Sequence, residues 1–296
     1  MATLSNYGPH TDAKHRILRR YLEAWLPIMG MAPGPTDQRG PALVVVDGFS
    51  GAGRYDTGEQ GSPLIMLDAY LEHRSRARIR QRIHFFFIEK EKKFISNLEE
   101  EVGRKPLEDS NADVEFRHGL FAEQFPDVIR QMKGRYARMP ATFAFIDPFG
   151  LKDNSLELTS GLAVQQRCEV LVYLPNGFMA RFESTDEFAP ALDHLYGSRD
   201  AWVYAKEIKH IEERRAWMRD RFGEVLSAQT TGSCLAFDIR GDQVTANAQQ
   251  TWRLSQWDDS EVREVASAEA SGSASRSIRD HRESGHPTCW YGHPTA

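Results

Sequence analysis

The stretch VVVDGFSGAGRYDTGEQGSP, residues 44–63, joins a run of β-branched residues to a glycine-rich turn, a polar loop and the start of a helix. Residues 43–47, LVVVD, are apolar up to the final aspartate, which is typical of a central strand covered on both faces. Ser62 is the expected N-cap of the following helix and Pro63 its first residue, because these residue types favour those positions. The stretch therefore predicts a strand, an open turn and a helix in succession.

The same alternation continues along the chain. Further strands are expected at residues 83–89, 114–119, 141–147, 169–175 and 234–239, and helices at 14–29, 63–74, 90–102 and 121–132. Strands that alternate with helices of this length predict an α/β fold, with a doubly wound, mostly parallel, Rossmann-like sheet and helices on both faces.

Three regions are expected. Residues 1–40 form an N-terminal helix and loop, and residues 41–240 form the Rossmann-like domain. Within it, a charged helical insertion at about 187–222 either caps the sheet edge or forms a lid. Residues 241–296 are rich in Ser, Ala, Gly and Arg, with little apolar periodicity, so this tail is expected to be irregular or disordered.

Composition narrows the class of protein. With 296 residues, 41% of them hydrophobic, the chain can bury a full core, and its net charge of −5 argues against a generally basic, nucleic-acid-coated surface. Cys168, Cys234 and Cys289 form neither a disulfide framework nor a zinc pattern, and no metal site is expected. No apolar run approaches the roughly 18 residues of a membrane span, and the N-terminus lacks a signal-peptide pattern, so we expect a cytoplasmic protein.

The glycine-rich turn is the first candidate ligand site. In a doubly wound sheet, ligands bind at the carboxyl ends of the strands where the strand order reverses. Asp47 ends the first strand there, Gly51 and Gly53 would let the backbone approach a ligand, and Gly48 is expected to supply an unusual φ. The alternative is that these glycines serve turn geometry alone.

The spacing around the turn favours a nucleoside without phosphates. The helix begins nine residues after Gly53, so its N-terminal N–H groups are not beside the turn as a pyrophosphate site requires, and no Walker GK[ST] follows. Glu89 ends the second strand, where a carboxylate can accept both ribose hydroxyls. The alternative for Glu89 is a charge that stabilises a helix N-terminus.

The fourth strand ends in a third signal, Asp147, Pro148 and Phe149. The proline keeps the preceding carboxylate out of helical conformation, and Phe149 offers a flat face to a planar substrate. Asp147 would orient or deprotonate a nucleophile. The alternative is an ordinary turn with Phe149 in the core.

These three signals together resemble class I S-adenosylmethionine-dependent methyltransferases. The resemblance implies that S-adenosylmethionine is the cofactor and that its methionine end meets the residues of the first turn: Asp47, Gly48, Gly51 and Gly53. It further implies that Glu89 holds the ribose and that Asp147, Pro148 and Phe149 face the methyl acceptor. DPFG also resembles the [DN]PP[YFW] signature of amino-methylating enzymes, although its second proline is missing.

A more specific resemblance covers residues 11–180. The segments KHRILRRYLEAWLPI, VDGFSGAGRYDTGEQGSPLI, FIEKE and FAFIDPFG occur in the same order in the three-Cys-motif partner proteins, TcmP. This resemblance implies a phage-associated role beside a three-Cys-motif protein. Members of that family continue with an aromatic strand and a final helix. Residues 241–296 show neither pattern, so we expect an exposed sheet edge and a divergent or frameshifted end.

Other interpretations remain open from the residues. A noncatalytic Rossmann-like partner or scaffold module is one, and a nicotinamide dehydrogenase is a weaker one because Asp56 replaces the third glycine of GxGxxG. RSRARIRQR, residues 74–82, is either a nucleic-acid contact or a solvated helix end. His118 lies either near an adenine or at the rim of the site.

Overall fold

The computed structural model describes residues 4, 7–32, 34–38, 40–148, 150, 155–163, 167–174, 187–230, 233–239 and 249–255. Its helices are α1 Pro9–Met31, α2 Ser62–Leu71, α3 Lys92–Gly103, α4 Phe121–Arg135, α5 Leu156–Ala163, α7 Ala189–Tyr196 and α8 Ile211–Ala228, with short 3₁₀ turns η1 Arg76–Arg78, η2 Arg199–Ala201 and η3 Val203–Glu207. Its strands are β1 Thr36–Asp37, β2 Gly40–Asp47, β3 Arg82–Glu89, β4 Ala112–His118, β5 Ala141–Ile146, β6 Cys168–Leu174, β7 Ser233–Ile239 and β8 Gln249–Ser255.

The strands form one sheet in the order β4-β3-β2-β5-β6-β8-β7, and β1 pairs antiparallel with β2 outside this path. The five strands from β4 to β6 are parallel to their neighbours, whereas β8 is antiparallel to both β6 and β7. The chain leaves β2 for β3 and β4 on one side and then crosses to β5 on the other, so the strand order reverses between β2 and β5. The prediction of a doubly wound, mostly parallel α/β fold is confirmed.

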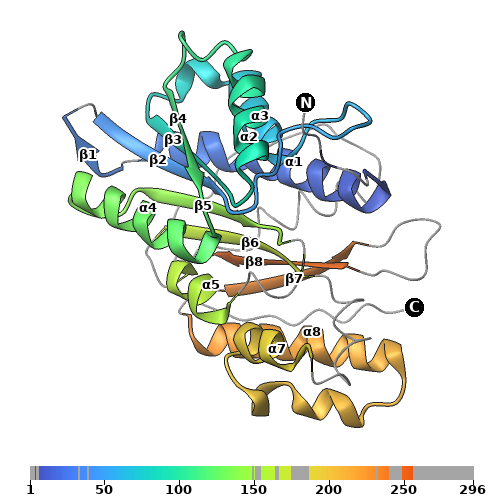
Figure 1. Cartoon of the computed structure of the whole chain (residues 1–296). Coiled ribbons are helices and arrows are strands. Elements are labelled where there is room, and N and C mark those ends of the chain that lie inside the picture. Colours follow the sequence, from blue (N-terminus) through green and yellow to red (C-terminus); the bar gives the residue numbers. More distant parts are fainter. Residues whose placement is uncertain are drawn as a thin grey trace.

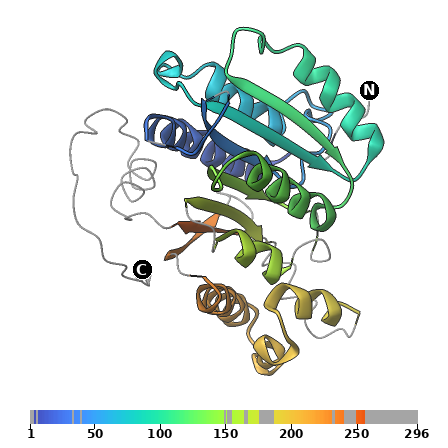
Figure 2. The ribbon, with the colours of Figure 1, turned by 90° about the vertical axis from the view of Figure 1, so that its left-hand side faces the viewer.

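Strand alternation divides the apolar side chains between two cores. Leu43 and Val45 of β2 face a core built with α1, α2 and α3, while Val44 and Val46 face a core built with α4, α5, α7 and α8. Figure 1 shows α2 and α3 on one side of the sheet and α5, α7 and α8 on the other, and Figure 2 shows the same layers from the side. Both faces of the central strands are therefore buried.

The N-terminal helix is fixed to the sheet by buried polar contacts. Trp25 of α1 donates its Nε1–H to Glu169 of β6 at 3.2 Å. Gln81, just before β3, donates its Nε2–H to the main-chain oxygens of Met29 and Ala32 at 2.9 and 2.6 Å. The last carbonyls of a helix lack the usual intrahelical donors; Met29 O accepts the Ala32 N–H at 3.3 Å, and Gln81 adds a side-chain donor to both carbonyls. α1 begins five residues earlier than the predicted helix, at Pro9.

Two sequence expectations need correction. Ser62 is the first residue of α2 and Gly61 is the N-cap, so the helix starts one residue earlier than predicted. The expected helical region at residues 187–222 contains α7 and most of α8, and both helices contribute to the core on one face of the sheet. The expected absence of a strand after residue 241 is wrong, since β8 runs between β6 and β7. α5 was not predicted.

None of the described helices combines the length and apolar character needed to cross a bilayer.

Candidate functional site

Three acidic residues gather at the carboxyl edge of the sheet. Asp47 ends β2, Glu89 ends β3, and Asp147 directly follows β5. The three strands are adjacent and parallel, and the charges of Asp147 and Glu89 both raise the pKa of Asp47. The structure thus brings the three predicted carboxylates together at the point where the strand order reverses.

Asp47 is the most unusual of the three, because it is fully buried and only partly hydrogen-bonded. Its Oδ1 accepts the Phe49 amide N–H at 3.1 Å, while Oδ2 has no partner among the described residues. Burial raises the pKa of Asp47 to about 7, and the charges of Asp147 and Glu89 add to this, while the hydrogen bond from the Phe49 N–H opposes it. An unpaired buried carboxylate oxygen is costly, so this position favours a ligand that brings a cation or a donor.

Each glycine of the first turn is required for its own structural reason. Gly51 and Gly53 have φ values of +62° and +80°, which side chains rarely adopt, and an added Cβ would lie 2.8 Å from Leu4 and 2.7 Å from Leu98 respectively. The prediction that Gly48 supplies an unusual φ is wrong, since Gly48 is not among the glycines with positive φ. Its Cβ would instead lie 2.8 Å from the Phe121 ring. Turn geometry and packing therefore require all three glycines.

Glu89 ties the turn to β3. Its Oε2 accepts the Gly51 N–H and its Oε1 accepts the Glu91 N–H, both at 2.8 Å. Two carboxylate oxygens offer about four acceptor positions, so two remain for a ligand. The side chain is buried at 6% exposure and also lines a cavity.

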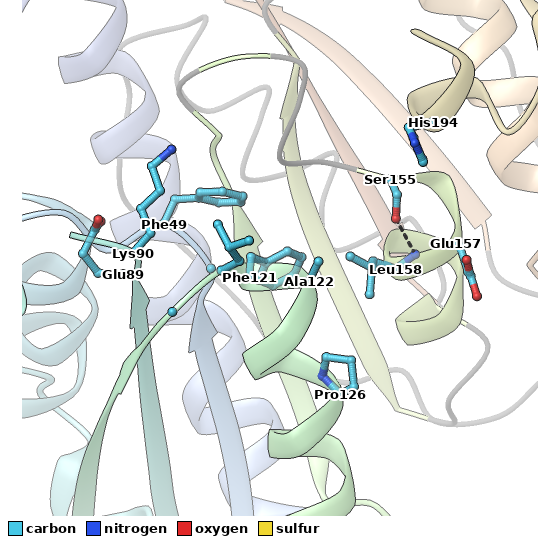
Figure 3. Close-up of a pocket in the computed structure, with 13 residues that line it drawn as sticks. Phe49, Glu89, Lys90, Phe121, Ala122, Pro126, Ser155, Glu157, Leu158 and His194 are labelled. Carbon is cyan, nitrogen blue, oxygen red and sulfur yellow. Dashed lines mark hydrogen bonds between the residues drawn. The ribbon is translucent and has the colours of Figure 1, made fainter. Parts of the chain in front are cut away.

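This cavity has a volume of about 500 Å³, within the range of small-molecule sites. Figure 3 shows Phe49, Glu89 and Lys90 at one end of the cavity, Phe121, Ala122 and Pro126 in the middle, and Ser155, Leu158 and His194 at the other end. Gly48, Gly119, Leu120 and Glu157 complete the lining. Its walls therefore come from the ends of β2 and β3 and from α4, α5 and α7.

Several of these lining residues were missed by the sequence reasoning. Gly119, with φ +146°, and Leu120 follow β4 at the same edge as Glu89, and that glycine was a usable signal. His194 gave no signal, because α7 reaches the cavity only through tertiary packing. His118 is exposed, its Nε2 lies 3.1 Å from the Lys90 main-chain oxygen, and it is not among the described residues of the lining.

Asp147 has a partner that the sequence did not predict. Lys14 of α1 lies with its Nζ 2.5 Å from Asp147 Oδ2, and both side chains are mostly buried. The same Nζ lies 4.1 Å from the centroid of the Tyr173 ring, a cation–π distance. Pro148 is buried, and Phe149 lies outside the described residues. The N-terminal helix therefore contributes a cation to the carboxyl edge.

The loop at residues 54–61 is held by the N-terminal segment. Leu4 accepts the Asp56 N–H at 2.8 Å and donates its own N–H to Arg54 at 3.0 Å. Tyr55 packs against Tyr7 and His15, with ring centroids 5.0 and 5.9 Å apart. Leu4 also contacts Gly51 from this side.

Acid is expected to weaken this N-terminal packing through His15. Burial and Lys14 lower the pKa of His15 to about 4, so the folded protein resists protonation that the unfolded chain accepts below about 6.5. The neutral ring makes its whole contribution to the free energy of unfolding above pH 6.5, roughly the pKa in the unfolded chain, and this contribution is lost as the pH falls toward 4. Between pH 7.5 and 5, the free energy of unfolding measured in urea should fall by about 2 kcal/mol less in the His15→Phe variant than in wild type. His118→Phe, at an exposed position, is the control, and equal losses in wild type and His15→Phe would contradict the assignment.

Comparison with known proteins gives fold-level likenesses at low identity. No family model and no curated protein matches the chain. Solved structures similar to it include a SAM-dependent methyltransferase from Agrobacterium tumefaciens, with a TM-score of 0.41 and 11% identity over 85% of this chain and 63% of that one. The methyltransferase domain of bacterial CtHen1 has a TM-score of 0.39 and 10% identity over 82% and 98%. The METTL16 methyltransferase domain has a TM-score of 0.37 and 11% identity over 81% of this chain and 68% of that one. The chain thus spans less than two thirds of the first of these structures.

Proposed function

We propose that the protein binds S-adenosylmethionine at the carboxyl edge of its sheet and acts as a class I methyltransferase. The observation that carries the proposal is the buried Oδ2 of Asp47 at the reversal of strand order, which has no partner in the part of the chain that the structure describes. S-adenosylmethionine has a sulfonium and an ammonium group, so it brings positive charge to a place where three carboxylates meet. A neutral nucleoside would leave the Asp47 carboxylate uncompensated.

The roles follow from position. Asp47 and the turn at Gly48, Gly51 and Gly53 would hold the methionine end, and Glu89 would accept the ribose hydroxyls with the two acceptor positions that its backbone contacts leave. The apolar wall at Leu120 and Phe121 suits the adenine. Polar anchors beside an apolar surface are the usual composition of a nucleoside site.

The acceptor side would be formed by Asp147, Pro148 and Phe149. S-adenosylmethionine supplies an electrophilic methyl group when bound. Asp147 would orient the acceptor through Oδ1, because Lys14 occupies Oδ2. A carboxylate at this place can accept a hydrogen bond from an amine or hydroxyl acceptor and take its proton.

The proposal includes a protein partner. Residues 11–180 resemble the three-Cys-motif partner proteins, and we propose that the chain acts beside a phage-type three-Cys-motif protein. Its support is the sequence resemblance alone, and the methyl acceptor would be presented by, or be part of, that assembly.

Calorimetric titration with S-adenosylmethionine and S-adenosylhomocysteine tests the cofactor. Wild type is expected to bind with micromolar affinity. Glu89→Gln should bind about 10-fold more weakly, because a neutral amide replaces a charged acceptor worth roughly 1.5 kcal/mol more to a hydroxyl donor.

The matched control is Asp147→Ala, which removes a carboxylate from the same edge but on the acceptor side. It should retain cofactor affinity within about 3-fold, because Lys14 already balances the charge of Asp147 and the proposal places this side chain beside the acceptor. A folded wild-type protein that binds neither compound would refute the proposed cofactor and favour a noncatalytic scaffold.

A further inference from the structure

A turn rich in arginine lies between α2 and β3. Arginine occupies every second position at Arg74, Arg76, Arg78, Arg80 and Arg82. Arg76 donates to the Asp109 main-chain oxygen at 2.5 Å, and Arg82 pairs with Asp113 at 2.6 Å. The other three side chains are exposed, and within the described part of the chain they form no ion pair. Two arginines thus stabilise the turn, and three present their charge outward.

This arrangement differs from the rest of the described surface. Many other arginines pair with a nearby acid: Arg16 with Asp12, Arg19 with Glu23 and Glu72, Arg54 with Glu101, Arg130 with Asp127, Arg135 with Asp37, and Arg221 with Glu224. The chain carries a net charge of −5, so acids are plentiful. Three neighbouring arginines that form no ion pair with the described residues therefore make a local positive patch on an acidic protein.

The patch borders a built concavity. A pocket of about 590 Å³ is lined by Arg74, Arg76 and Arg80 together with His73, Asn111 and one acid, Asp109. His73 is held in place because its Nδ1 accepts the Ser75 N–H at 3.0 Å and its Nε2 lies 2.9 Å from the Glu23 main-chain oxygen. Arg76 is fixed by its bond to Asp109. The pocket walls are thus set before any ligand arrives, which lowers the entropic cost of binding.

The pocket lies at the opposite end of the strands from the candidate cofactor site. The arginine turn leads directly into Arg82, the first residue of β3, whereas Glu89 is the last residue of the same strand. Eight strand residues span about 25 Å, so the two sites do not share a ligand the size of a nucleoside. This placement also means that the following inference does not depend on the identity of the cofactor.

We propose that this pocket and the exposed arginines around it bind the phosphate backbone of a nucleic-acid strand. Guanidinium groups donate in pairs to phosphate oxygens, which makes arginine the preferred residue for this contact. A free phosphate needs only one or two of them. Arg74 and Arg80 line the pocket, and Arg78 lies on the turn outside the lining, so the exposed positive charge extends beyond the pocket, as contact with more than one phosphate of a strand requires. The site holds the strand by charge and reads no base sequence.

Fluorescence anisotropy with a labelled 20-nucleotide single strand tests the proposal on the full chain. Wild type should bind at low salt, and Arg74→Gln/Arg78→Gln/Arg80→Gln should bind at least 10-fold more weakly. Each phosphate contact on a single strand contributes roughly 0.7 to the slope of log K against log salt concentration. Removing three contacts should therefore make this slope less steep by about 2. Arg16→Gln/Arg104→Gln/Arg130→Gln, at exposed positions paired with acids, changes the net charge equally and should stay within about 3-fold of wild type.

Competition and a cofactor titration separate the outcomes. Inorganic phosphate should displace the strand only at much higher concentration, and anionic vesicles should not be retained by the arginine turn. The proposal would be overturned if wild type did not bind the strand, or if both triple variants lost the same affinity. It would also be overturned if phosphate or vesicles, but not the strand, bound in a way that depends on the arginine turn. S-adenosylmethionine affinity should be unchanged in both folded variants, so failure here leaves the proposed cofactor untouched.

Discussion

The Asp47→Asn variant is expected to lose S-adenosylmethionine affinity by at least about 100-fold and to be more stable than wild type. The affinity falls because a neutral amide cannot compensate the positive charge of the ligand, and a charged contact in a buried site is worth about 3 kcal/mol. The stability rises because the fully buried carboxylate, whose Oδ2 has no partner among the described residues, no longer has to be kept out of water. Calorimetry and urea unfolding measure the two effects separately.

The stability gain should depend on pH in a defined direction. Burial raises the pKa of Asp47 to about 7 in the folded protein from 3.8, so the folded state holds a proton that the unfolded chain has lost. Wild-type stability from this group therefore declines as the pH rises from about 4 to 7. The advantage of Asp47→Asn should grow by about 3 kcal/mol between pH 5 and pH 8.

Asp127→Asn provides the control, because this aspartate is half-exposed and pairs with Arg130 on the surface of α4. It should change neither cofactor affinity nor the pH profile. If Asp47→Asn bound S-adenosylmethionine like wild type, Asp47 would be a structural carboxylate and the observation that carries the proposed function would fail. A gain in stability without loss of binding would separate the two roles.

The fold could be predicted from local sequence. The alternation of apolar strands with amphipathic helices is set by neighbours a few residues apart, and each strand of the parallel sheet has to end at the same edge. Asp47, Glu89 and Asp147 were predictable for this reason, as acids at strand ends. A buried acid that costs stability stands out against the apolar run before it.

The rest of the site depends on contacts between distant parts of the chain. Lys14 and Asp147 are separated by 133 positions, and Trp25 and Glu169 by 144, so no local pattern links them. β8 was missed because its surrounding tail has a polar composition, although the strand pairs on both sides with β6 and β7. Gly48 was misread for a related reason, since its neighbour Phe121 comes from α4.

Gly51→Val is expected to abolish cofactor binding and to reduce the free energy of unfolding by about 2–4 kcal/mol. A β-branched residue at φ +62° costs 1–2 kcal/mol or more, and its Cβ would lie 2.8 Å from Leu4. Relief of that contact moves the Gly51 N–H away from Glu89 Oε2, which now lies at 2.8 Å. The turn and the Glu89 carboxylate would then shift together. Circular dichroism during urea unfolding and calorimetry with S-adenosylmethionine measure the two losses.

Gly58→Val separates backbone strain from collapse of the turn. Gly58 also has a positive φ, +100°, but an added Cβ would meet nothing within 4 Å. The variant should therefore lose about 1–2 kcal/mol of stability from strain alone and retain cofactor affinity. If Gly51→Val stayed folded and bound like wild type, the turn would not contact the ligand. If both variants lost binding, the loop at residues 54–61 would itself be part of the site, and Tyr55 would be the side chain to replace next.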